Sequence, residues 1–458
     1  MFPALSYMKI VILGAGVTGS SVAGALASEE NDIVVIDKNP SLLTELKGRL
    51  DIATIEGNAA HPSILEQAGI RDADMVIAVT DRDETNMLAC QVINTLYSKP
   101  KTIARVRAID FLNHPQLFQP GGIDIVISPE QVVTESIHNL IKYPGALHVS
   151  EFADGLVRLF SIRVVPTGFL TGKRIHAVKE KLADSMIRVA AIFRDGKAIP
   201  VNGEAVIATG DEVFFVCPRE KVLKTLVDLH KLESPIKTIM LAGGGHVGKR
   251  LGIALQHNYQ VKIIEKDINR AREIANDLRH TLILHGDCTD ESLLQEEMIE
   301  NIDLFCAITN NDGINLIAAG LAKKLGAKKS ICLVNNNSYL KLLDGSDIDL
   351  AIQPKLETLG GILKHVRKGD VVGVSSVCGG SAEAIEAIAH RSKNSSSVVG
   401  LRVDQVNLPD GVILGALIRE KEVIPVHHDT VFAEGDHVVM FALNKKLIKD
   451  IEEYFQPI

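Results

Sequence analysis

Two short stretches of the chain combine an apolar run with closely spaced glycines, a pattern suited to holding a phosphate group. The first run, residues 10–13, leads into a GxGxxG spacing, and the second, residues 239–241, leads into a similar cluster. Glycine lets the chain turn sharply, lets the backbone approach a pyrophosphate and lets the following helix pack closely. The start of that helix then offers free N–H groups to the phosphates. The glycines concerned are Gly14, Gly16, Gly19, Gly243, Gly244, Gly245 and Gly248.

An acidic residue follows each glycine cluster at the end of the next apolar run. Asp37 stands 18 residues after Gly19, and Glu265 holds the matching place in the second half. A carboxylate there can accept hydrogen bonds from the ribose hydroxyls of an adenosine and would repel a 2′-phosphate. Two copies of the whole pattern therefore predict two dinucleotide sites that favour NAD over NADP. The alternative is that these are solvated carboxylates at strand ends.

Polar residues also follow the fourth apolar run of each half. Thr80 and Asp81 stand there in the first half, and Thr309 and Asn310 in the second. Because ligands bind at the carboxyl ends of parallel strands, we expect these residues to lie near the ribose or the phosphate. Asp83 and Asp312 fit better as N-caps of the helices that follow. Backbone groups of Gly57-Asn58 and Gly286-Asp287 could contact an adenine.

The two halves differ in the fifth apolar run. The first reads Ile103-Ala-Arg-Val-Arg107 and the second reads Ile331-Cys-Leu-Val-Asn335. Arg105 could form a charge-assisted bond to a phosphate, whereas Leu333 cannot. The alternative for Arg105 is a surface ion pair. We infer that the two sites are not equivalent and that the first suits a ligand with more phosphate charge.

The elements that must position these residues alternate between strand and helix. Apolar runs without polar alternation, separated by helical stretches, predict a parallel sheet covered on both faces, of the doubly wound Rossmann type. We expect a helix over residues 130–143, stopped by Pro144-Gly145. The predicted strands of the first half cover residues 10–13, 33–37, 52–55, 75–79, 102–107 and 123–127.

The pattern changes beyond residue 150. Short stretches with strand character cover residues 157–164, 187–193 and 213–217, and a helix is expected over 223–229. Asp195-Gly196 is typical of a hairpin turn. Residues 150–230 are therefore predicted to form a small α+β domain.

The second half repeats the first. Gly14, Gly57, Thr80, Asp83 and Asn86 each recur 229 positions later, and residues 191–194 and 210–213 recur 225 positions later. The chain is thus a tandem duplication of one nucleotide-binding domain plus one small domain. We predict an extension at 1–7, nucleotide-binding domains at 8–147 and 233–368, and small domains at 148–232 and 369–458. Residues 392–397 resemble a mobile spacer.

Composition narrows the class of protein. The 458 residues carry a net charge of −8 with 46% hydrophobic and 23% charged residues, typical of a globular protein and unlike a nucleic-acid-binding one. The six cysteines show no CxxC spacing and read as buried thiols in a reducing compartment.

Residues 10–28 lack charge, but their glycines favour strand, turn and helix over a membrane span. No signal peptide is evident, and Met8-Lys9 resembles a natural start of the chain.

No convincing catalytic set accompanies the nucleotide sites. Tyr97 and Lys101 have the spacing of a dehydrogenase pair, but Pro100 between them would break the helix that must hold both. His427-His428 fits an ordinary turn better than a metal site. We therefore predict no catalytic residue, no metal and no enzyme activity. The alternative is a soluble NAD-dependent oxidoreductase. A third hypothesis, a redox-sensing transcription factor, would need a basic helix-turn-helix, which we do not find in the sequence.

As a set, these motifs resemble the TrkA family of Trk potassium-uptake regulatory subunits, whose chains carry two RCK (KTN) units. The matching stretches cover almost the whole chain from Met8; they are residues 14–19, 36–37, 78–86, 103–105, 143–146, 189–194, 243–248, 307–309, 365–367 and 435–436. The resemblance implies NAD(H), ATP or ADP as ligands. It implies a peripheral protein on the cytoplasmic face of the inner membrane, a homotetramer, and an integral-membrane potassium channel or transporter of the TrkH/TrkG type as partner.

The resemblance also implies the residues of both sites. Asn58 departs from the family pattern, in which aspartate is common, as at Asp287. The first site would contain Gly14, Ala15, Gly16, Val17, Thr18, Asp37, Thr80, Asp81 and Arg105, together with Gly19 of the glycine spacing. The second would contain Gly243, Gly244, Gly245, His246, Val247, Glu265, Thr309 and Asn310, together with Gly248.

Overall fold

A computed structural model describes residues 8–28, 31–97, 100–118, 121–182, 186–229, 235–340, 342–343, 345–366, 371–377, 380–390 and 398–455. The proposed extension at residues 1–7 and the proposed spacer at 392–397 lie outside these residues. The chain forms two compact units. One contains residues up to Val132 together with Lys355–Val366, and the other contains Val133–Pro354 and the chain from Arg367 onward.

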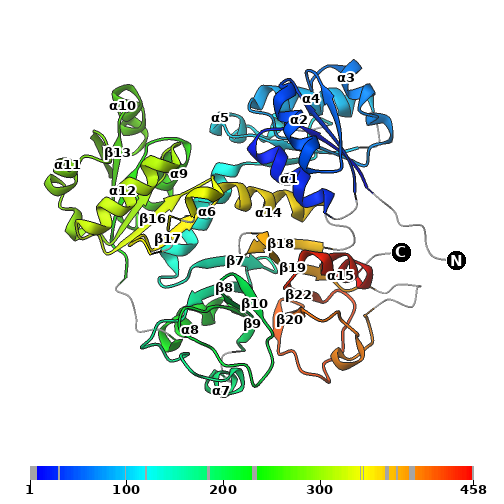
Figure 1. The fold of residues 1–458 in the computed structure, drawn as a ribbon, viewed down its shortest axis with the longest axis vertical. Coiled ribbons are helices and arrows are strands. Elements are labelled where there is room, and N and C mark those ends of the chain that lie inside the picture. Colours follow the sequence, from blue (N-terminus) through cyan, green and yellow to red (C-terminus); the bar gives the residue numbers. More distant parts are fainter. Residues whose placement is uncertain are drawn as a thin grey trace. The chain divides into compact units, whose positions relative to one another are not determined.

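The first unit is built on a six-stranded parallel sheet with the order β3-β2-β1-β4-β5-β6 (Figure 1). The order reverses beside β1, which creates a crevice at the carboxyl ends of β1 and β4. The strands are β1 (Lys9–Leu13), β2 (Asp32–Asp37), β3 (Ala53–Glu56), β4 (Met75–Ala78), β5 (Lys101–Arg105) and β6 (Ile125–Ile127). The helices between them are α1 (Val17–Ala27), α2 (Pro40–Arg49), α3 (Pro62–Gln67), α4 (Asp83–Leu96) and α5 (Ile109–Leu112).

The second unit contains a matching sheet with the order β14-β13-β12-β15-β16-β17. Its strands are β12 (Thr238–Ala242), β13 (Gln260–Glu265), β14 (Thr281–His285), β15 (Leu304–Ala307), β16 (Lys329–Leu333) and β17 (Leu350–Ile352). Its helices are α9 (His246–Leu255), α10 (Ile268–Asp277), α11 (Glu291–Glu296), α12 (Asp312–Lys324) and α13 (Asn337–Leu340). The predicted doubly wound parallel sheets are therefore confirmed in both halves.

The second unit also holds both small α+β domains, each with an antiparallel five-stranded sheet of the same order. The first contains β7 (His148–Phe152), β8 (Val157–Arg163), α7 (Ile175–Lys181), β9 (Arg188–Arg194), β10 (Lys197–Ile199), β11 (Glu212–Pro218) and α8 (Val222–Leu229). The second contains β18 (Val371–Val377), β19 (Ala382–Ile388), β20 (Val412–Arg419), β21 (Glu422–Ile424), β22 (His437–Ala442) and α15 (Ile448–Tyr454). Figure 1 shows the two sheets side by side. Buried apolar side chains of both sheets form one hydrophobic cluster.

Two helices depart from the simple order of the duplication. Helix α6 (Pro129–Lys142) follows the first parallel sheet, but its residues 133–142 belong to the second unit. Helix α14 (Pro354–Val366) follows the second parallel sheet, but its residues 355–366 belong to the first unit. Gly361 of α14 lies against Ile127 and Val132 of that unit. Helix α14 thus packs on a core that lies far away in sequence, whereas α6 continues into the unit that directly follows it.

The hairpin predicted at Asp195-Gly196 is confirmed. Asp195 has φ 49° and Gly196 has φ 73°, so both central residues are left-handed, as a type I′ turn requires. The turn joins β9 to β10, with Arg194 paired to Lys197. Across the described residues, every helix is too short or too polar to span a bilayer.

Candidate functional site

A cavity of about 520 Å³ opens at the carboxyl ends of the strands of the first parallel sheet. Most of the predicted first-site residues line it, namely Gly14, Gly16, Val17, Thr18, Asp37, Thr80, Asp81 and Arg105. Sequence reasoning missed further lining residues, which are Ile36, Lys38, Asn39, Leu42, Ala59, Val79, Arg82, Thr85 and Arg107. Gly57, whose backbone was a candidate for contact with an adenine, also lines the cavity, whereas Asn58 does not belong to the lining.

The Asp37 carboxylate is held at the edge of this cavity by backbone N–H groups. The N–H of Ala15 donates to Oδ2 at 2.6 Å, and the N–H of Asn39 donates to Oδ1 at 2.8 Å. Each oxygen retains a free lone pair, because an ionised carboxylate accepts about four hydrogen bonds. The geometry is therefore suited to receiving two ribose hydroxyls.

Glu265 is held in the same way as Asp37, by two backbone N–H groups. The N–H of Gly244 donates to its Oε2 at 2.8 Å, and the N–H of Asp267 donates to Oε1 at 2.8 Å. A Cβ on Gly244 would lie 2.6 Å from Ile274 Cδ1 and 3.0 Å from Glu265 Oε2. An alanine at this position, as at Ala15 of the first half, would thus require the Ile274 side chain to move.

Gly19 and Gly248 pack the helix against the glycine turn, and Gly19 is not among the residues that line the first cavity. A Cβ would lie 1.8 Å from the carbonyl oxygen of Gly14 at Gly19, and 1.9 Å from that of Gly243 at Gly248. Gly14 has φ +111° and Gly243 has φ +118°, values that disfavour any side chain. Of the second set, His246 and Val247 begin α9, directly after the glycine turn.

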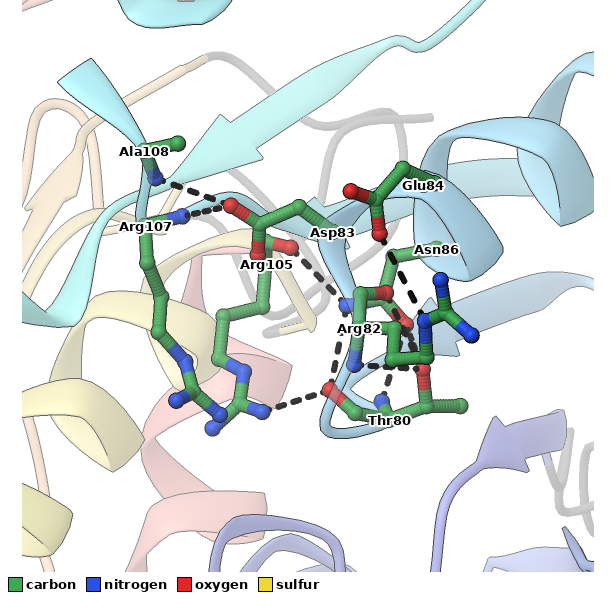
Figure 2. A network of polar contacts seen from close by, with 8 residues as sticks. All are labelled: Thr80, Arg82, Asp83, Glu84, Asn86, Arg105, Arg107 and Ala108. Atoms are coloured by element: carbon green, nitrogen blue, oxygen red, sulfur yellow. Dashed lines mark hydrogen bonds and ion pairs between the residues drawn. The ribbon is translucent and has the colours of Figure 1, made fainter. Parts of the chain in front are cut away.

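Thr80 is held by a buried asparagine (Figure 2). Oδ1 of Asn86 accepts from the Thr80 N–H at 2.8 Å and from the Thr80 hydroxyl at 2.7 Å, while its amide donates to the carbonyl of Arg105 at 2.9 Å. Asn315 makes the same bonds to Thr309 and Leu333. Because each threonine hydroxyl donates its proton to the asparagine, its oxygen can act only as a hydrogen-bond acceptor toward a ligand. That suits a ribose hydroxyl better than a phosphate.

The prediction that Asp83 and Asp312 are N-caps is wrong. The N-caps are Arg82 and Asn311, and each aspartate is the first helical residue. Oδ2 of Asp83 accepts from the N–H groups of Arg107 and Ala108, both at 2.8 Å (Figure 2). Oδ2 of Asp312 accepts likewise from Asn335 and Asn336. Each aspartate therefore holds the loop after the fifth strand.

Arg105 is not in a surface ion pair. Its guanidinium donates to the Thr18 hydroxyl at 3.2 Å and to the Thr80 carbonyl. Figure 2 shows the guanidinium groups of Arg105 and Arg107 next to each other. Burial, and then the charge of Arg107, lower the pKa of Arg105 to about 10. Two cations this close repel each other, so an anion bound between them would relieve the repulsion.

The matching positions of the second half carry no such charge. Leu333 and Asn335 replace the two arginines, and Asn311 replaces Arg82, which in the first half faces Glu84 at 3.7 Å. Asn310 replaces Asp81. The loss of positive charge noticed at Arg105 in the sequence therefore extends to the positions of Arg82 and Arg107.

The other candidate residues lie apart from this chemistry. Tyr97 follows the end of α4 and Lys101 begins β5, so the pair shares no helix. The His427 N–H donates to the Thr430 hydroxyl in a turn. The five cysteines that the structure describes are buried free thiols, and Cys378 lies outside the described residues. Within the described residues, no cluster of three or more His, Cys, Asp or Glu is arranged for a metal.

These features define a class: tandem dinucleotide-binding proteins, each half pairing a Rossmann-type domain with a small α+β domain. A protein-family model named TrkA-N domain matches residues 10–129 and 239–354, and one named TrkA-C domain matches residues 389–456. The Trk system potassium uptake protein TrkA of Halomonas elongata is 46% identical over 451 residues, covering 98% of this chain and 99% of that protein. Its namesake from Vibrio alginolyticus is 44% identical over 453 residues, with the same coverage.

The chain therefore belongs to the TrkA family of Trk potassium-uptake proteins. Among solved structures, the GsuK RCK domain superposes with a TM-score of 0.62 at 16% identity, covering 99% of this chain and 96% of that one. The GsuK channel bound to NAD gives the same TM-score at 15% identity, covering 99% and 80%. At this identity the likeness shows a shared fold.

Proposed function

We propose that the protein is a regulatory subunit that binds NAD(H) and ATP or ADP in its two crevices and thereby gates a membrane potassium uptake system. The observation that carries the proposal is the arrangement of charge in the first cavity. Asp37 ends β2 and Arg105 ends β5, on opposite sides of β1 in the sheet. Three strand spacings of about 4.8 Å separate them, so the carboxylate and the arginines are spaced for a ribose and a polyphosphate.

The relatives support this choice of ligand and partner. The related proteins are named for potassium uptake, and a channel of the same fold is described as bound to NAD and, in another structure, to ADP. We place the protein at the cytoplasmic face of the inner membrane as a homotetramer beneath an integral-membrane subunit of the TrkH/TrkG type. We also retain the division into domains at 8–147, 148–232, 233–368 and 369–458.

Regulation requires that a ligand bind two conformations with different affinity. Hinged domains, with Pro144-Gly145 at one joint, would supply those conformations. The paired arginines of the first site would discriminate between a triphosphate and a diphosphate, because each added phosphate charge strengthens their interaction. The second site, without these arginines, would favour a ligand with less phosphate charge.

A role without catalysis fits the first cavity better than an oxidoreductase role. Neither a tyrosine nor a histidine is among its described lining residues, and its lysine, Lys38, directly follows Asp37 on the ribose side. A dehydrogenase needs a proton donor or acceptor beside the nicotinamide. Reduction of NAD by the purified chain with a small-molecule substrate would support the alternative.

The decisive experiment is reconstitution with the membrane partner in vesicles and measurement of potassium flux. We expect flux to change when ATP, ADP, NAD⁺ or NADH is added, and the change to disappear when both Asp37 and Glu265 are replaced by alanine. Vesicles without the regulatory chain are the control. Flux that is independent of every nucleotide would refute the regulatory role.

A further inference from the structure

The second crevice contains an arginine that the first one lacks. Asn39 and Asp267 are the N-caps of α2 and α10, and Leu42 and Arg270 are each the third residue of those helices. Leu42 lines the first cavity. By the symmetry of the duplication, Arg270 therefore stands where the second crevice receives the nucleoside end of a ligand.

The guanidinium of Arg270 is held at both ends. Nε donates to the carbonyl oxygen of Gly244 at 2.9 Å, and Nη1 lies 2.6 Å from Glu273 Oε1. The side chain is only 24% exposed. Since Gly244 also donates its N–H to Glu265, this one residue connects the arginine to the proposed ribose-binding carboxylate.

We propose that Arg270 is a specificity-determining residue of the second site, a flat platform on which the purine ring of the bound nucleotide stacks. A guanidinium stacks on aromatic rings through its planar face, whereas a lysine ammonium is a point charge without a flat surface. The two hydrogen bonds lie in the guanidinium plane, so they leave its faces available. The proposal rests on the proposed function and adds a preference for the larger, purine base to the second site.

Calorimetric titration of the full chain can test the platform. Asp37→Ala and Arg105→Ala together weaken the first site, so binding then reports on the second. We expect ADP to bind more tightly than CDP, which carries the same phosphates on a smaller ring. Arg270→Leu, which introduces the residue of the first site, should weaken ADP binding about 3- to 30-fold and leave CDP much less affected.

Two further variants separate the possible outcomes. Arg270→Lys should lose as much ADP affinity as Arg270→Leu; if it binds like the parent, charge and not the planar group is responsible and the proposal fails. Tighter ADP binding by Arg270→Leu would show instead that the arginine obstructs the site.

Leu42→Arg, made in the chain with an intact first site, should raise the ADP-over-CDP preference there. If neither ADP nor NADH binds the second site while Arg270 is present, it is the proposed function that fails.

Discussion

Asn86 and Asn315 are fully buried, and each joins the ends of two neighbouring strands. Each asparagine amide satisfies backbone groups of the fourth and fifth strands, which a parallel sheet leaves unpaired where the strands diverge. The sequence showed them only as matching positions of the repeat. Their role in holding Thr80 and Thr309 at the crevice required the tertiary structure.

We expect Asn86→Ala to destabilise the first parallel-sheet domain by about 2 kcal/mol or more, because buried backbone groups lose their partners. It should also weaken nucleotide binding at the first site, since Thr80 is released. Calorimetric melting and titration with ADP measure the two effects. Asn113→Ala, at an exposed position, is the control; equal melting temperatures for the two variants would contradict the role of Asn86.

The paired arginines lead to a second prediction at this scale. Arg105→Ala should weaken ADP binding at the first site about 10-fold or more, because a charge-assisted hydrogen bond is lost. Leu333→Ala should alter binding at the second site far less. Titration calorimetry of each variant in the full chain distinguishes the two, and equal losses would argue against the asymmetry of the sites.

At the scale of elements, the two hairpins of the small domains differ in how well their residues suit the turn. Asp195-Gly196 joins β9 to β10, whereas Glu420 and Lys421, with φ 49° and 69°, join β20 to β21. A left-handed conformation costs a residue other than glycine about 1 kcal/mol or more. The second hairpin therefore carries backbone strain that the first avoids at Gly196.

Lys421→Gly should stabilise the second small domain by about 1 kcal/mol, since glycine adopts φ > 0 freely. The matched change Gly196→Lys should destabilise the first small domain by a similar amount. Thermal melting followed by near-ultraviolet circular dichroism and calorimetry measures both. A destabilised Lys421→Gly variant would mean that the lysine side chain contributes more than its backbone strain costs.

Asp303 connects the starts of two strands and makes the second parallel sheet sensitive to acid. It accepts from the N–H groups of Lys237 and Thr238 and from Lys328 Nζ. Burial alone would raise the pKa of Asp303, but these bonds hold that pKa at about 2, below the usual range of an aspartate. Its contribution is therefore present above pH ~4 and is lost as the pH falls toward 2.

Asp303→Asn should accordingly lower stability at pH 7 and flatten the loss of stability between pH 4 and 2, compared with the unaltered chain. Urea unfolding across this pH range provides the measurement. Asp404→Asn, at an exposed position beside Arg402, is the control. The prediction is wrong if the acid-induced loss keeps its full slope in Asp303→Asn.

At the scale of the whole molecule, duplication has produced two sheets that pack on each other in the second unit. Phe214 and Phe441 meet with ring centroids 5.5 Å apart, and the backbone N–H of Ala153 donates to Glu386 Oε2 at 2.8 Å. Gly415 makes close approach possible, because a Cβ there would lie 3.0 Å from Val216 Cγ2. We therefore expect the two small domains to unfold together on heating.

Gly415→Val should lower the melting temperature of the second unit, because extra methyl groups in a packed core cost about 1–3 kcal/mol. Gly24→Ala, on α1 with nothing within 4 Å of the new Cβ, is the matched control and should be neutral or stabilising. Calorimetry compares the two. An unchanged transition in Gly415→Val would contradict the packing of β20 against β11.

The sequence by itself determined the repeated architecture, both glycine turns, the strand-end carboxylates Asp37 and Glu265 and the charge difference at Arg105, because each depends on local spacing and on the periodicity of apolar residues. It assigned Asp83 and Asp312 to helix caps, and it did not reveal Arg107, Leu42 or Arg270 as site residues. Whether such side chains line a crevice depends on how neighbouring strands and helices are placed around it, which only the tertiary structure shows. The packing of α14 on the first unit was likewise decided by the tertiary structure, because an amphipathic sequence predicts that a helix has a buried face but not which core that face packs against.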